Sequence, residues 1–103
     1  MTRVEPTADG FRVVGADGRA IELAWADVVA VSAYAVDAIV HVVRHLDFAL
    51  VDGSAIEVSA QVDGWEVVLD GIACHLAVQV ADVAAAIGSL SPDGDVQTVA
   101  LAR

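Results

Sequence analysis

Four residues have side chains that commonly bind metals or act in nucleophilic catalysis: His41, His45, Cys74 and His75. On a helix, His41 and His45 would lie one turn apart and could share a metal ion. On a strand, the same spacing separates them by roughly 13 Å, too far for two ligands with bonds near 2 Å. Segment 38–46 has apolar residues at helical spacing, but its β-branched content favours a strand. We therefore expect surface or structural histidines and no metal site.

Cys74 and His75 are neighbours in a stretch with helical periodicity. A histidine can activate a thiol as a nucleophile only when its imidazole reaches the thiol proton. Adjacent helix residues point about 100° apart, so His75 is badly placed for this task. As the single cysteine, Cys74 has no partner for an internal disulfide. We expect it to be a small buried residue, and we predict no catalytic pair and no cofactor.

Carboxylates are abundant, but most of the conspicuous ones have a structural explanation. Six of the eight glycines follow an aspartate, which is typical of turns and helix caps. The Asp-Gly pairs lack the spacing of a calcium-binding loop. The chain also lacks a phosphate-binding glycine motif and a G-x-S-x-G nucleophile motif. These patterns predict no general acid–base pair.

Tyr34 is the one residue that we expect to contact a partner. It falls on the more polar face of its expected strand, where an exposed aromatic ring could anchor a second protein. Trp25, Phe48 and Trp65 fit the core or its rim.

One amphipathic helix organises the expected fold. It spans 64–76, and its apolar residues recur at the spacing that lines up one face of a helix: Trp65, Val68, Leu69, Ile72 and Leu76. Asp63 stands at the expected N-cap, and Glu66 could complete a capping box. Such a helix must pack against something, and the residues before it read as a sheet.

Alternating apolar residues and Asp-Gly turns predict strands at 11–14, 19–25, 28–37, 42–51 and 54–60. We expect a shorter second helix over 80–87 and a final strand over 96–102, with 1–10 as a loose lead-in. The predicted fold is α+β: a bent antiparallel sheet in a meander of about five strands, packed by the two helices. Residues 1–103 form a single domain.

Composition limits the possible partners. The formal net charge of −10 disfavours nucleic acid and anionic membrane surfaces. The hydrophobic fraction of 57% argues against disorder, while charged residues and glycines interrupt every apolar run before it reaches membrane-spanning length. The first residues do not resemble a signal peptide, so we expect a cytoplasmic protein.

Several short motifs together resemble a known group of proteins. They are Trp25–Tyr34, Asp52-Gly53, Ile56–Val58, Gly64-Trp65 and Thr98–Arg103. From about Phe11 to Arg103 the chain is similar to small uncharacterised bacterial proteins with the pattern W-D-V, A-Y-x-x-D, D-G, I-x-V, G-W, T-V-L-x-x-R. This resemblance implies no activity and no catalytic residues. It implies a strongly bent antiparallel sheet closed by helices, of pleckstrin-homology type. A Pro-Gly expected after the main helix is replaced here by Ala77-Val78.

Many apolar residues without a coherent catalytic set favour a non-catalytic protein-interaction module, which we expect to self-associate. The alternative is a small-molecule-binding or enzymatic domain that uses a pocket between sheet and helix, with Cys74, His41 or His45 nearby. A narrower alternative is an immunity or antitoxin-like protein that neutralises a basic toxin. Small size and acidity are its only support.

Overall fold

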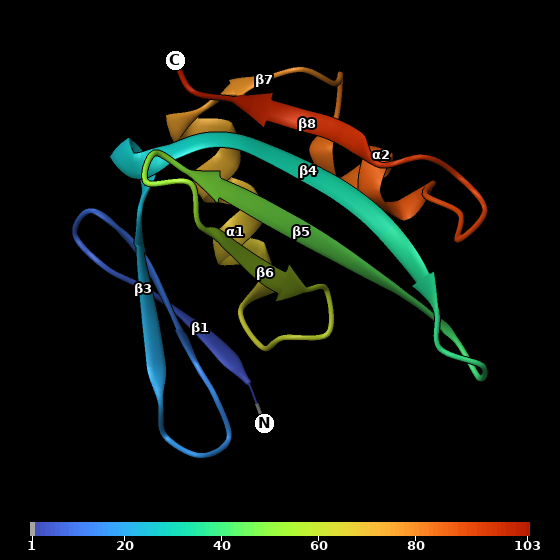
Figure 1. The fold of residues 1–103 in the computed structure, drawn as a ribbon, viewed down its shortest axis with the longest axis horizontal. Helices are drawn as coiled ribbons and strands as arrows, with labels where there is room; N and C mark the ends of the chain where they lie inside the picture. The colour runs from blue at the N-terminus through green and yellow to red at the C-terminus, as the bar shows by residue number, and fades with distance from the viewer. Residues whose placement is uncertain (1) are drawn as a thin grey trace.

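The computed structural model describes residues 2–103, which fold into two antiparallel sheets and two α-helices. The smaller sheet has the order β1-β2-β3, and its strands are Arg3–Pro6 (β1), Gly10–Val14 (β2) and Ala20–Ala24 (β3). The larger sheet has the order β6-β5-β4-β8-β7, and its strands are Val28–Asp37 (β4), Val42–Leu50 (β5), Ala55–Ser59 (β6), Ala77–Val78 (β7) and Gln97–Leu101 (β8). The helices are Trp65–His75 (α1) and Val83–Gly88 (α2). The α+β class is confirmed (Figure 1).

The consecutive strands that we expected in one meander are divided between the two sheets. A 3₁₀ turn at Trp25–Asp27 ends the smaller sheet and starts the larger one. It turns the Trp25 ring into the core, where the ring centroids of Phe11 and Phe48 lie 5.2 and 6.1 Å away. Burying this ring fixes the point at which the chain changes direction. The final strand, β8, then returns to pair with both β4 and β7.

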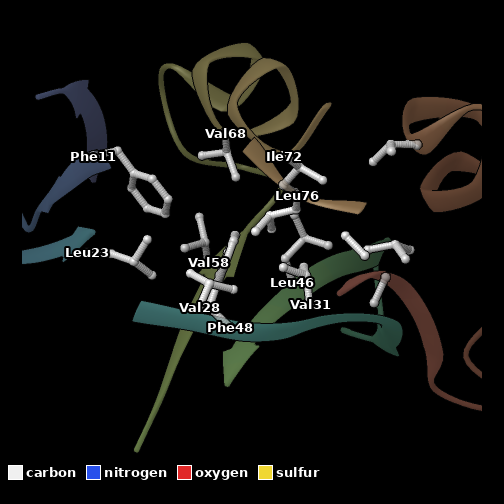
Figure 2. Packing of buried hydrophobic residues seen from close by; sticks show 14 of the residues in the cluster. Phe11, Leu23, Val28, Val31, Leu46, Phe48, Val58, Val68, Ile72 and Leu76 are labelled. Atoms are coloured by element: carbon white, nitrogen blue, oxygen red, sulfur yellow. The ribbon is translucent and has the colours of Figure 1, made fainter. Parts of the chain in front are cut away.

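One hydrophobic core joins the two sheets and α1. Phe11 and Leu23 project from the smaller sheet toward Val68 and Ile72 of α1, above Phe48 of the larger sheet (Figure 2). Val68 and Ile72 are fully buried, and Leu76 is nearly so. The predicted apolar face of the helix is therefore the face that packs, with Trp65 and Leu69 at its half-buried margin.

The segment before β2 is not a loose lead-in, as we had expected. It contains β1, which pairs along β2 and buries Val4. The Val4 amide also donates to the carbonyl of Asp63 over 2.7 Å, and the Asp63 amide donates to Thr2 over 3.1 Å. Pairing to distant backbone gives this polar segment its structure, because its own residues carry little strand signal.

This contact also corrects the expected start of α1. Gly64, at φ 86°, takes the N-cap position, and no side chain caps the helix. A Cβ on Gly64 would lie 2.6 Å from the Val4 carbonyl oxygen, so β1 approaches too closely for any other residue. α2 does have a side-chain cap, since Asp82 accepts a hydrogen bond from the Ala85 amide.

The ambiguous segment 38–46 is a turn followed by a strand. β4 ends at Asp37 and β5 begins at Val42, so residues 38–41 form the tip of a long hairpin. The strand interpretation is therefore confirmed from Val42 onward.

Candidate functional site

Three polar side chains meet on the outer face of the larger sheet, away from the core. Tyr34 in β4 pairs with His45 in β5, and the next strand, β6, carries Glu57. Their neighbours in the strands, such as Leu46 and Val58, are buried on the opposite face. Because side chains alternate across a strand, Tyr34, His45 and Glu57 share the solvent side. We call them the outer-face cluster.

Glu57 joins the members of this cluster. One of its carboxylate oxygens accepts a hydrogen bond from the Tyr34 hydroxyl, and the other lies 3.4 Å from Nδ1 of His45. The Tyr34 ring stacks on the imidazole, with centroids 5.3 Å apart and planes 22° apart. The hydrogen bond to Glu57, then partial burial and the charges of Glu57 and Asp47, raise the pKa of Tyr34 to about 12. The phenol therefore stays protonated at neutral pH, where it can donate a hydrogen bond but cannot act as a base.

Tyr34 was the predicted partner contact, and its placement differs from that of a freely exposed anchor. The ring is half-buried against His45, and the hydroxyl is already engaged. Contact between Tyr34 and a partner stays a prediction. The partner would meet the exposed part of the ring, because the hydroxyl is bonded to Glu57.

The histidines do not converge. His41 lies at the hairpin tip, where its Nε2 is 2.8 Å from Nε2 of Gln61, whereas His45 belongs to the outer-face cluster. His75 lies on α1 and stacks on Trp25, with centroids 5.5 Å apart. Within residues 2–103, no three His, Cys, Asp or Glu side chains are grouped so that they could hold a metal ion.

Cys74 is exposed, so the expectation of a buried thiol was wrong. The buried face of α1 carries Val68 and Ile72, and Cys74 falls outside it. Its neighbour His75 is engaged with Trp25 rather than with the thiol.

The hairpin tip is the feature that our reading of the sequence missed. Ile39 and Val40 are 97% and 85% exposed, and the flanking strand residues Val36 and Val42 are also exposed. Apolar side chains gathered at one protruding point are unusual on a monomer surface. The available signal was a hairpin turn, 38–41, without any glycine, asparagine or proline.

The backbone at this tip is strained. Ile39 has φ 76°, and the Val40 amide donates to the Ala38 carbonyl over 2.9 Å across it. A bond spanning three residues with this central φ matches the γ-turn that is rare and strained. Ile39 is the only non-glycine residue with positive φ within 2–103. Its side chain is β-branched, the type that tolerates positive φ least. Asp37 helps to hold it, because its Oδ1 accepts from the Ile39 amide.

The hairpin extends beyond the neighbouring strands (Figure 1). β8 pairs with β4 only as far as Ala33, and β6 pairs with β5 only as far as His45. Beyond these points, β4 and β5 pair with one another, from Tyr34 opposite His45 to Asp37 opposite Val42. We call residues 34–45 the ribbon. It presents strand edges along both sides and apolar side chains at its end.

Comparisons with protein-family models, with curated proteins and with solved structures gave no match for this chain. The family resemblance therefore stays a prediction. Residues 2–103 contain no helix of the length and apolarity needed to cross a membrane.

Proposed function

We propose that the protein is a non-catalytic interaction module that self-associates through the ribbon. The observation that supports this most is Ile39, which is 97% exposed and held at φ 76°. Strain in its backbone costs free energy in the isolated chain, and its exposed side chain gains none of the free energy of burial. Backbone strain of this kind clusters at functional positions, and burial of the side chain in an interface would offset the strain.

A second copy suits this surface on electrostatic grounds. Each chain carries a net charge of −10, so two copies repel unless they meet where acidic residues are scarce. Segment 38–46 contains no Asp or Glu and carries Arg44 with two histidines. Contact at the tip of the ribbon therefore keeps most carboxylates of the two chains apart, and Asp37 is the one carboxylate on the ribbon itself.

The backbone also permits a symmetric contact. The Ala38 amide donates to the His41 carbonyl, and hydrogen-bonded pairs alternate along an antiparallel hairpin. On the β4 side, the backbone N–H and C=O groups of Ala35 and Asp37 therefore point away from β5. A two-fold axis beside β4 would pair these groups with their equivalents in the second copy, and Asp37 is the one carboxylate that this pairing brings near its equivalent. The same axis would bring both tips against the partner's ribbon.

The rival function needs a pocket between sheet and helix. That space is filled, since core side chains from both sheets meet α1 there (Figure 2). Trp25 packs so closely that a Cβ on Gly71 would lie 2.1 Å from its Cζ2. The grooves beside Trp25 and His75 are open surface hollows of about 280 and 170 Å³. We therefore prefer the interaction module, with no cofactor and a cytoplasmic location as further parts of the proposal.

Sedimentation equilibrium over a range of concentrations tests self-association. The double variant Ile39→Asp/Val40→Asp should raise the dimer Kd at least about 100-fold, because each buried aliphatic side chain contributes about 1.5–3 kcal/mol and each occurs twice. Val51→Asp is the matched control. It makes the same chemical change at a 66% exposed position in the turn between β5 and β6, outside the ribbon, and it should leave the Kd unchanged. A wild-type chain that stays monomeric at millimolar concentration would contradict the proposal.

A further inference from the structure

β6 is an edge strand with unused backbone groups. The Leu50 amide donates to Ser54, and the Ala60 amide donates to Arg44. With the register of Phe48 opposite Ile56, these bonds establish which residues of β6 face β5. Ile56 and Val58 bond to β5, while the N–H and C=O groups of Ala55 and Glu57 point away from it. No hydrogen bond within residues 2–103 uses these outward groups.

A groove of about 440 Å³ lies beside the C-terminal part of this edge, from Glu57 to Ser59. Val58, Val62 and Val13 supply its apolar lining, whereas Glu57 is the ionisable residue within it. Val13 of the smaller sheet and Thr2 lie on the side of the groove opposite β6, so residues from both sheets line it. Its volume is typical of a site for a short ligand segment.

We propose that the β6 edge binds an extended segment of a basic partner protein by strand addition. A strand added there would form backbone hydrogen bonds with Ala55 and Glu57. The side chain opposite Glu57 would lie on its face of the sheet, where a cationic group pairs with the carboxylate. The next side chain would lie opposite Val58 and enter the apolar part of the groove. The segment therefore alternates Arg or Lys with aliphatic residues.

Charge selects this occupant over a second copy. Two β6 edges meeting around Glu57 would place like carboxylates opposite one another, which is destabilising. Each copy would also bring a net charge of −10 to the contact. A cationic strand instead gains from that charge during encounter and binding. This site uses a different edge of the sheet from the ribbon, so it does not depend on self-association through the ribbon.

The test uses a blocked seven-residue peptide of alternating Arg and Val, labelled for fluorescence anisotropy. Glu57 presents its backbone groups outward, so in antiparallel addition the arginine opposite it directs its own N–H toward β6. N-methylation of the arginines should weaken binding at least 10-fold, whereas N-methylation of the valines should leave the Kd within about 3-fold. A peptide of alternating Glu and Val should not bind. Amide shifts in NMR should be largest at Ala55 and Glu57.

Two protein variants localise the contact. Ala55→Pro removes an outward N–H without touching the ladder to β5, a position where edge strands tolerate proline, and it should weaken the Arg-Val peptide about 10-fold. Ile39→Asp, on the ribbon, should not change peptide binding. If both sets of N-methylated peptides bind equally, or if Ile39→Asp rather than Ala55→Pro abolishes binding, strand addition at β6 is wrong. If Ala55→Pro fails to fold, the pair of N-methylated peptides decides the question alone.

Discussion

The two hairpins that share β5 are built in opposite ways. The turn between β5 and β6 uses Asp52-Gly53, in which Gly53 takes φ 88° and Asp52 accepts hydrogen bonds from the Ser54 amide and hydroxyl. The turn between β4 and β5 uses Ala38 to His41, in which Ile39 takes φ 76°. The first turn has residues suited to its backbone and exposes polar groups. The second has an unsuited residue and exposes apolar ones.

This contrast separates a turn whose residues suit its backbone from one whose residues do not. Nothing lies within 4 Å of a Cβ built on Gly53, so its conformation alone explains the glycine there. At the other turn, glycine or asparagine would fold better than Ile39. The proposed contact would account for Ile39 at this position.

A substitution in the polar turn tests whether backbone strain explains the difference between the two hairpins. Gly53→Ile would place a β-branched residue at φ 88° and should lower the free energy of unfolding by about 1–2 kcal/mol. For a domain of this size that corresponds to a fall in Tm of roughly 4–16 °C. Gly53→Asn is the control, since asparagine tolerates the left-handed region and should cost far less. Equal losses for both variants in urea unfolding would show that strain does not set the residue preference.

The opposite substitution, at Ile39, tests whether relief of strain stabilises the apolar turn. Ile39→Asn should raise the free energy of unfolding of the monomer by about 1 kcal/mol, because it relieves the strain while weakening self-association. Val40→Asn makes a similar change in polarity at the next residue, which has no positive φ, and it should give no such gain. Urea unfolding at concentrations below the dimer Kd measures both. A gain shared by the two variants would indicate a general effect of polarity rather than strain.

Periodicity and turn chemistry predicted the elements whose structure is determined locally. The apolar face of α1 and the Asp-Gly hairpins at Gly18 and Gly53 follow from residue type and spacing. β1 was missed because its order comes from pairing with β2 and from the contact between Val4 and Asp63. Such long-range backbone pairing leaves little trace in the residues themselves.

The candidate sites were harder to predict for the same reason. Alternation placed Tyr34 on the polar face, but its contact with Glu57 depends on the register across three strands. Turn propensity could have drawn attention to 38–41, where the usual turn residues are missing. The exposure of Cys74 depends on which face of α1 packs against the sheets, and tertiary packing determines that face.

The outer-face cluster connects the two hairpins through the hydrogen bond between Tyr34 and Glu57. Alkaline titration of Tyr34 tests whether this bond persists in solution. Tyr34 is the single tyrosine, so absorbance at 295 nm reports it alone, and we expect a pKa of about 12. Glu57→Gln should lower this pKa toward 10, because the hydrogen bond to the carboxylate is its largest cause. Asp47→Asn should lower it less, since the Asp47 charge is the smallest cause.

The same shift predicts the direction of the pH dependence. The pKa of Tyr34 is raised in the folded chain, so its stabilising contribution is complete below pH 10 and is lost as the pH rises toward 12. In Glu57→Gln this loss should be smaller, because folded and unfolded pKa values then lie closer together. A wild-type tyrosine that titrates near 10 would mean that the hydrogen bond does not persist in solution. In that case Tyr34 would not fasten the base of the ribbon to β6 through Glu57.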